Sequence, residues 1–442
     1  MILHLLIAAS TAPAEPAPIR ITEREKAADH SLSLTPAQMF EAAELAQRKH
    51  DFATAEAIYR ALSSNPARAI RNEARFRLAR LLKARHQLTD AALLLRRILD
   101  EQPNAQPVRL ELASVLVMMG DEAGARRELR AARAGQLPPA VARQVDRFSE
   151  ALRARKSFGG TIDIGLASDS NVNRATRSDT LGTVIGDFTL DKNARAQSGQ
   201  GLAVQGQVYR RLPLGSRTDL LGTVSGSGDF YRQSRFDDVT LGASLGPEFK
   251  RGQYQVNVRA GASRRWYGGA PFTDAATLQT DVARPISATA ELRGAAAASR
   301  IWNHLNPLES GQSFAGSIGT ELAFSTTTGG GLSLTGIRQA LRDPGYSTTS
   351  GQLSLFGWHE AGRVTFTAAL TGGRLIADRR LLLYLDRRDE TLYRATIGMA
   401  ARQVQYKGFA PTASITWERN RSPIEIYDYA RTVLNVGLTR AF

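Results

Sequence analysis

The segment QYQVNVRAGA, Gln253 to Ala262, alternates between two kinds of side chain without a break. One face would carry Tyr254, Val256, Val258, Ala260 and Ala262, and the other Gln253, Gln255, Asn257, Arg259 and Gly261. Successive side chains of a β-strand point to opposite sides, so this period of two predicts a strand with one apolar face. Alternation of the same kind recurs from Gly159 onward, and we predict a β-domain over residues 158–442.

Fourteen alternating segments can be placed in this domain. They begin near Gly159, Gly199, Arg217, Asp237, Gln253, Leu278, Ala288, Gln312, Gly330, Gln352, Arg363, Thr391, Phe409 and Thr432. Brief turns follow the even-numbered segments, and mostly longer connections follow the odd-numbered ones. Such a pattern is typical of an antiparallel transmembrane β-barrel of the outer membrane, and we predict one of 14 strands. Its last strand carries Leu434, Val436, Leu438 and Phe442 on one face, which we interpret as the signal for barrel assembly.

Residues 35–157 have a different texture, with Ala, Leu, Arg and Glu at helical spacing. Ala55, Ala91 and Ala125 lie 36 and 34 residues apart, near the period of tetratricopeptide-type repeats. Pro66 and Pro103 end two units, because proline cannot continue an α-helix. We predict an α-solenoid of tetratricopeptide-like helix pairs, which binds an extended partner or serves as a passive spacer.

Two short segments precede the helices. Residues 1–14 combine an apolar stretch with Ala12-Pro13-Ala14, which predicts a cleaved export signal, although a frayed or misassigned start would look similar. Residues 15–34 then form a linker. Apolar stretches are too short for a membrane-spanning helix, which needs roughly 20 residues.

The chain is basic, with 57 Lys and Arg against 42 Asp and Glu and a net charge of +15. This excess is spread over both domains and forms no dense basic arm, so we expect no nucleic-acid partner. We interpret the arginines of the helical region as a solvated helix face: Arg96, Arg97, Arg126, Arg127 and Arg130. Lumen-facing positions of the barrel mix both signs of charge: Asp163, Gln205, Gln207, Asp229, Arg259, Glu291, Arg293, Glu321 and Arg394.

Residues for catalysis or metal binding are sparse. Cysteine is absent, and His304 and His359 are predicted at opposite rims of the barrel, so they cannot share a site. A hydrolase using His304 with a loop serine, and a calcium loop at Asp169 to Asn173, are weaker interpretations than an ordinary loop. We therefore expect no enzyme, no catalytic residue, no metal and no cofactor.

Four motifs resemble one known family. They are DSNVNRA (Asp169 to Ala175), WERNRSP (Trp417 to Pro423), YDYAR (Tyr427 to Arg431) and VGLTRAF (Val436 to Phe442). Together with the two-domain pattern, they are similar to the surface lipoprotein assembly modulator family, Slam. The resemblance spans nearly the whole chain, because that family also joins a periplasmic tetratricopeptide-like domain to a 14-stranded barrel.

The resemblance implies an outer-membrane translocator that moves client lipoproteins or secreted soluble proteins to the cell surface. Its implied partners are the client, the barrel-assembly machinery, outer-membrane lipid and, as a further candidate, periplasmic chaperones. The motif positions become structural or client-contacting candidates: Asp169, Asn171, Asn173, Trp417, Arg419, Asn420 and Ser422. A porin-like or exopolysaccharide-exporting barrel and a soluble binding protein are the alternatives, and transit through the lumen or through a parted seam is left open.

Overall fold

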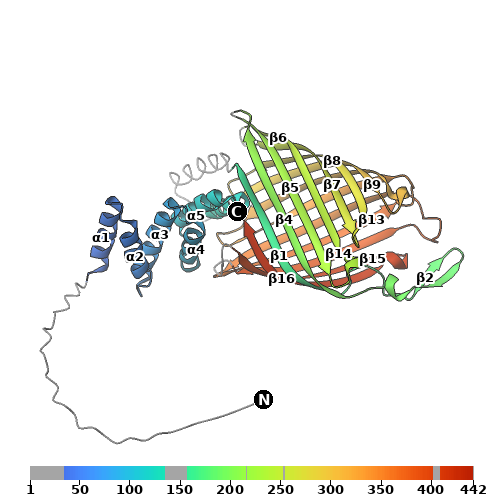
Figure 1. Cartoon of the computed structure of the whole chain (residues 1–442), viewed down its shortest axis with the longest axis horizontal. Helices are drawn as coiled ribbons and strands as arrows, with labels where there is room; N and C mark the ends of the chain where they lie inside the picture. The colour runs from blue at the N-terminus through green and yellow to red at the C-terminus, as the bar shows by residue number, and fades with distance from the viewer. Residues whose placement is uncertain (1–33, 135–156, 216, 252–253, 402–408, 442) are drawn as a thin grey trace, which may run out of the picture.

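The structure, a computed structural model, describes residues 34–134, 157–215, 217–251, 254–401 and 409–441. The predicted export signal, most of the predicted linker and Phe442 lie outside the described residues. Two domains follow one another along the chain, a group of helices and a β-barrel (Figure 1).

Within residues 34–134, the first domain has six helices: α1 (Pro36–Arg48), α2 (Phe52–Leu62), α3 (Arg68–Ala84), α4 (Leu88–Glu101), α5 (Gln106–Met119) and α6 (Glu122–Ala134). Ala55, Ala91 and Ala125 are fully buried in their core. His50, His86 and Gly120 begin the turns inside the three helix pairs, and each has a positive φ, of 60°, 59° and 88°. The three pairs therefore share one turn geometry, while the tetratricopeptide type of the repeat stays a prediction.

Fourteen antiparallel strands form the closed barrel that the alternation predicted. Their bounds are β1 (Phe158–Asp169), β4 (Gly199–Pro213), β5 (Thr218–Tyr231), β6 (Asp238–Arg251), β7 (Tyr254–Tyr267), β8 (Ala270–Pro285), β9 (Ala290–Asn303), β10 (Gly311–Ala323), β11 (Thr328–Leu341), β12 (Thr348–Ala361), β13 (Val364–Ala377), β14 (Asp389–Ala401), β15 (Ala410–Arg421) and β16 (Tyr429–Ala441). Each strand pairs with its neighbours along the chain, and β1 closes the circle by pairing with both β4 and β16.

One predicted strand start was wrong. Thirteen starts lie within four residues of the observed ones, but the strand expected near Leu278 begins at Ala270. The connection before it is a two-residue turn in which Gly268 and Gly269 have φ of +58° and +81°, a conformation that glycine adopts without strain. A register irregularity between Arg265 and Trp266 accommodates Pro271, which interrupts the alternation in the sequence.

A small hairpin was not predicted. It consists of β2 (Thr180–Thr183) and β3 (Gly186–Thr189) in the long connection after β1, and it forms a separate two-stranded sheet. Figure 1 shows it projecting beyond the barrel, away from the helices.

The apolar face of the strands is the outer surface of the barrel. Leu434, Val436 and Leu438 of β16 are about half exposed, as are their counterparts on the other strands, such as Leu241 and Leu370. This alternation of apolar-out and polar-in is the arrangement that suits a lipid-facing barrel. Among the helices of the described residues, none has the length and apolar character to cross a membrane.

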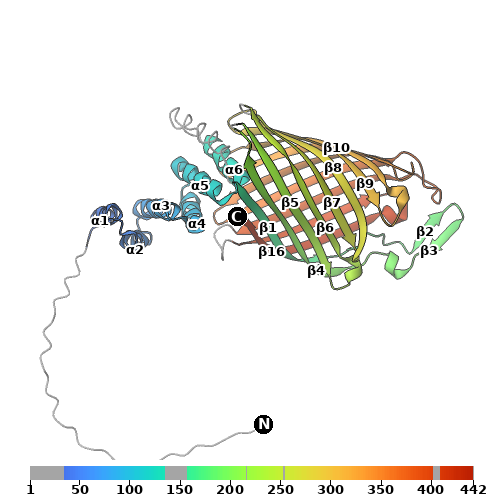
Figure 2. The same ribbon diagram turned by 45° about the horizontal axis from the view of Figure 1, so that its top comes forward.

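The two ends of the barrel differ. At what we call the short-turn end, turns such as residues 286–289, 324–327 and 362–363 join the strands. At the long-loop end lie the longer connections after β1, β5, β9, β11, β13 and β15, several of which contain short 3-10 turns. The helical domain sits at the short-turn end, with α5 and α6 nearest the barrel (Figures 1 and 2).

Candidate functional site

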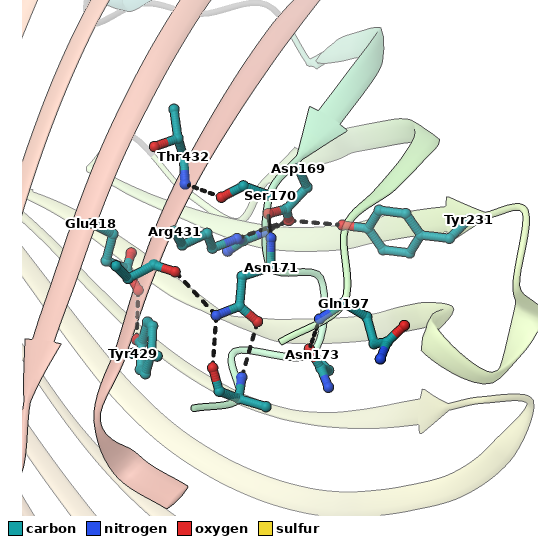
Figure 3. A network of polar contacts seen from close by, with 12 residues as sticks. Asp169, Ser170, Asn171, Asn173, Gln197, Tyr231, Glu418, Tyr429, Arg431 and Thr432 are labelled. Carbon is teal, nitrogen blue, oxygen red and sulfur yellow. Dashed lines mark hydrogen bonds and ion pairs between the residues drawn. The ribbon is translucent and has the colours of Figure 1, made fainter. Parts of the chain in front are cut away.

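The first motif, DSNVNRA, folds over the long-loop end beside the last strand (Figure 3). Asn171 is fully buried, and its side-chain amide donates to the backbone oxygens of Ala175 at 2.8 Å and Ala430 at 3.1 Å. Its side-chain oxygen accepts the backbone N–H of Ala175 at 3.0 Å. One asparagine thus closes its own loop and fixes that loop to the chain entering β16, which explains why an amide stands at this position.

Asn173 holds the far end of the same loop. Its amide donates to the backbone oxygen of Arg195 at 2.8 Å, and its oxygen accepts the backbone N–H of Gln197 at 3.0 Å. The two asparagines therefore pin both ends of the long connection that carries β2 and β3.

Asp169 ends β1 with a fully buried carboxylate. Arg431 of β16 donates to it through Nε at 2.8 Å, the Tyr231 hydroxyl lies 3.4 Å away, and the backbone N–H of Asn171 donates at 2.9 Å. Since β1 and β16 are the first and last strands, this ion pair crosses the seam that closes the barrel (Figure 3).

Three residues of the WERNRSP motif hold the loop between β15 and β16. Arg419 pairs with Asp428 at 2.6 Å, and the backbone N–H of Ser422 donates to the same carboxylate at 3.3 Å. Asn420 is buried and donates to the backbone oxygen of Tyr427 at 2.7 Å and to Glu390 at 3.0 Å. These three residues hold the connection between β15 and β16 and do not touch the Asp169 cluster.

Trp417 belongs to neither cluster, because it points outward from β15 and is 47% exposed. An indole at that position suits the interface between lipid and water. The alternation places the next residue, Glu418, on the inner side, where Arg394 donates to it at 2.7 Å and Tyr429 at 2.6 Å. Glu418 and Arg431 were missed as site residues, although both lie within the quoted motifs.

The loops at the long-loop end share a small apolar core. Leu381, Tyr384 and Ile424 are buried there, with Leu181, Tyr346, Ile426 and Tyr427 packed against them. Burial raises the pKa of Tyr427 to about 12, and the guanidinium of Arg388 lies 4.0 Å from the centre of its ring. Contacts within the barrel domain alone thus order this end.

At the short-turn end, the charges of two domains meet. Glu291 of β9 and Glu321 of β10 are directly paired across the strands, an arrangement that repels on its own. Arg293 compensates from the same side, at 2.7 Å from Glu291 and 3.2 Å from Glu321. Arg130 of α6 supplies the second cation, with Nη1 at 3.3 Å from Glu291 and an ion pair with Glu321.

The interpretation of Arg130 as part of a solvated helix face was therefore wrong. Its side chain is only 10% exposed, and this burial lowers its pKa while Glu321 and Glu291 oppose that shift. The helical spacing places Arg130 on one side of α6, but only the barrel shows that this side is covered.

A second contact lies beside the first. Arg109 of α5 is 1% exposed and pairs with Glu128 of α6 at 2.6 Å, and Glu360 near the end of β12 lies 3.9 Å away. Asn104 accepts a hydrogen bond from the hydroxyl of Thr326 at 3.2 Å. The helical domain thus contacts the turn before β11 and the end of β12 as well as the inner wall of the barrel.

A profile of the family described as "Surface lipoprotein assembly modifier" matches residues 160–442, almost the entire barrel. The protein of that name from Moraxella catarrhalis is 26% identical over 217 residues, which cover 48% of this chain and 41% of the relative. Surface lipoprotein assembly modifier 1 from Haemophilus influenzae is 22% identical over 191 residues, 42% of this chain and 38% of the relative.

The matched region spans less than half the length of these relatives. Among solved structures, the crystal structure of a Pseudomonas aeruginosa FadL homologue is similar with a TM-score of 0.40 and 10% identity, over 72% of this chain and 93% of that one.

Proposed function

Because the chain belongs to the surface lipoprotein assembly modifier family, we propose that it moves client proteins from the periplasm to the cell surface. The chain forms a β-barrel of the outer membrane. The clients in this proposal are lipoproteins, as the relatives' names suggest, or soluble secreted proteins. The proposed role is transport without catalysis.

The observation that carries the proposal is the attachment of the helical domain to the short-turn end. Arg130 and Arg109 bring buried cations to Glu291, Glu321 and Glu360, so a helical domain on the periplasmic side would stand at the entrance of the barrel. A plain pore has no need of a folded domain at its mouth. A translocator does, because a client chain must be captured before it can enter.

We assign the route to the lumen. The seam between β1 and β16 carries the buried pair of Asp169 and Arg431, and parting the seam would break this buried ion pair. Passage through the lumen leaves that pair intact and only requires α6 to leave the Glu291 and Glu321 pair.

The proposal includes further partners. The outward-facing Leu434, Val436 and Leu438 on the last strand suit recognition by the barrel-assembly machinery together with Phe442. Periplasmic chaperones would deliver an unfolded client to the helices, and outer-membrane lipid surrounds the apolar face of the barrel.

The test is co-expression with a candidate client lipoprotein, followed by protease treatment of intact cells. We expect the client to become protease-accessible with the wild-type chain and to remain protected without it. Glu291→Gln with Glu321→Gln leaves Arg130 unpaired in the lumen, and we expect reduced export at an unchanged barrel level. A client that reaches the surface equally well without the chain would remove the proposal, and secreted polysaccharide in its place would favour an exopolysaccharide exporter.

A further inference from the structure

A hollow of about 480 Å³ lies in the helical domain, between α2, α3 and α4. Its lining is basic, with Arg60, Arg71, Arg75 and Arg97, and its remaining walls are Ser63, Ser64, Asn65, Pro66, Leu78 and Leu94. The volume lies in the range of sites that hold small ligands or a few residues of a peptide.

The acidic residues beside the hollow balance its arginines only in part. Glu101 accepts hydrogen bonds from Arg71 at 2.9 Å and from Arg75 at 2.7 Å, which lowers the pKa of its carboxyl to about 2 and keeps it ionised. Glu56 pairs with Arg60 at 2.7 Å and is shared with Arg85. The hollow therefore keeps a net positive charge.

Arg97 adds to this excess from α4. It is exposed, and among the residues that the structure describes it has neither a hydrogen bond nor an ion pair. A guanidinium beside other guanidinium groups, without an acidic partner, is stabilised by an anion from outside.

Two further features of the hollow offer unused donors. The Nε of Arg75 is buried and has no hydrogen-bond partner, which costs free energy unless a ligand or water accepts from it. Asn65 and Pro66 lead into α3, whose N-cap residue Ala67 provides no side-chain cap and whose first turn has no acidic residue. The positive end of the helix dipole is thus left without a negative charge.

The apolar part of the lining distinguishes a peptide from a bare inorganic anion. Leu78 and Leu94 form a floor beside the arginines, which suits an apolar side chain next to a carboxylate. Inorganic phosphate would use the arginines but leave this floor uncovered.

We propose that the hollow binds a carboxylate of an extended client segment, carried by an acidic side chain or by the chain terminus, with a neighbouring apolar side chain on the leucine floor. The proposal rests on the proposed function, since it names the chemistry by which the helical domain captures a client. It extends that function because it places capture in α2 to α4, away from the contact between α6 and the barrel.

The experiment measures binding of fluorescein-labelled peptides to the full chain in detergent micelles by fluorescence anisotropy. Three peptides share one apolar residue: an acidic peptide with an amidated end, its Gln and Asn version with a free carboxyl end, and the same neutral version amidated. We expect either of the first two to bind, which identifies the source of the carboxylate, and the third to bind at least tenfold more weakly. Equal binding of all three would overturn the proposal.

Arg97→Gln is the decisive variant, because Arg97 has no partner in the described chain and its loss should leave the thermal transition unchanged. We expect it to weaken binding about tenfold, the loss of one charge-assisted hydrogen bond. Arg127→Gln on the exposed face of α6 is the matched control and should bind like wild type. Equal affinity of the Arg97 and Arg127 variants, or inorganic phosphate displacing the peptide completely at equimolar concentration, would contradict a peptide carboxylate site.

The outcome is independent of the export test. If the peptide binds and Arg97→Gln weakens it while a client is not exported by the wild-type chain, the site stands and the transport function falls. If a client is exported equally by wild type and Arg97→Gln, and no peptide binds, the function stands and this site falls.

Discussion

Buried carboxylates at the two ends of the barrel are neutralised by cations from different parts of the chain. At the long-loop end, Asp169 meets Arg431, and both belong to the barrel wall. At the short-turn end, the paired Glu291 and Glu321 receive Arg130 from a separate domain. A cation on the same wall can leave only if the barrel unfolds, whereas a cation on another domain can leave while the barrel stays folded. Under the proposed transport function, we therefore expect the short-turn end to be the end that opens.

We expect Asp169→Asn to have the largest effect, a loss of stability of the folded barrel. This change leaves Arg431 buried without an anionic partner, and breaking a buried pair in this way costs about 3–5 kcal/mol. The folded form of the barrel should be lost at a clearly lower temperature, measured as the shift between folded and unfolded bands on gels of detergent samples heated in steps. Adding Arg431→Gln should restore part of the loss, because no unpaired charge then remains.

The control for this variant is a pair on the outside of the same barrel. Arg264 and Asp274 are 2.6 Å apart, but the arginine side chain is half exposed and solvent screens the pair, so Asp274→Asn should barely change the melting temperature. If Asp169→Asn lowers the temperature no more than Asp274→Asn does, the long-loop end is not held by its buried pair and the contrast between the two ends fails.

We expect Arg130→Gln to have a smaller effect, and to weaken the contact between the helical domain and the barrel instead of the stability of the barrel. The barrel should melt as before, but the helical domain should detach from it more often, by about 2 kcal/mol of contact free energy. The chain has no cysteine, so cysteines placed at Asn104 and Thr326, whose side chains are hydrogen-bonded at 3.2 Å, report the contact through their rate of disulfide trapping. We expect slower trapping and, in planar bilayers, longer open periods.

Arg127→Gln, three residues earlier on the exposed face of α6, should trap at the wild-type rate. Trapping that is equally fast in Arg130→Gln would show that α6 is held by other contacts. A lower melting temperature of the barrel in that variant would show that the two domains are one cooperative unit, which would break the comparison.

The difference between the ends also decides what could be predicted from the sequence. The period of two predicts the strands and the closed barrel, because every strand has one apolar face and one polar face. Asn171 and Asp169 could be found because they belong to a compact motif. The partner of Asp169, Arg431, lies 262 residues away, and only the closure of β1 on β16 brings the two motifs together.

The contact at the short-turn end could not be predicted in the same way. A helical period shows which residues share a face of α6, but the covering surface is a barrel whose glutamates are 161 and 191 residues away. The alternation does place Glu291 and Glu321 in the lumen, and their register across the strands makes a like-charge pair. Arg293 on the same wall balances only one of these two charges, and the remaining negative charge was the available signal for a cation from elsewhere.

We expect the smallest effect from Glu101, which joins α3 to α4 through Arg71 and Arg75. Replacing it tests whether the helical domain is one rigid body. The folded pKa of Glu101 is about 2 against a usual 4.5, so its stabilising contribution is complete above pH 4.5 and is lost as the pH falls toward 2. We expect Glu101→Gln to cost about 1–2 kcal/mol at pH 7. In helix-reporting circular dichroism of the full chain, the wild type and the variant should converge near pH 2.

The same substitution should act on the basic hollow in the opposite direction. Without Glu101, Arg71 and Arg75 lose their acidic partner and the hollow becomes more positive, so the carboxylate peptide should bind more tightly although the domain is less stable. Disulfide trapping between positions 104 and 326 should not change, because α5 and α6 hold the barrel through Arg109 and Arg130 and not through Glu101. A trapping rate that falls together with the stability of α3 and α4 would mean that capture and gating are one process, and that the short-turn end opens when the helices themselves loosen.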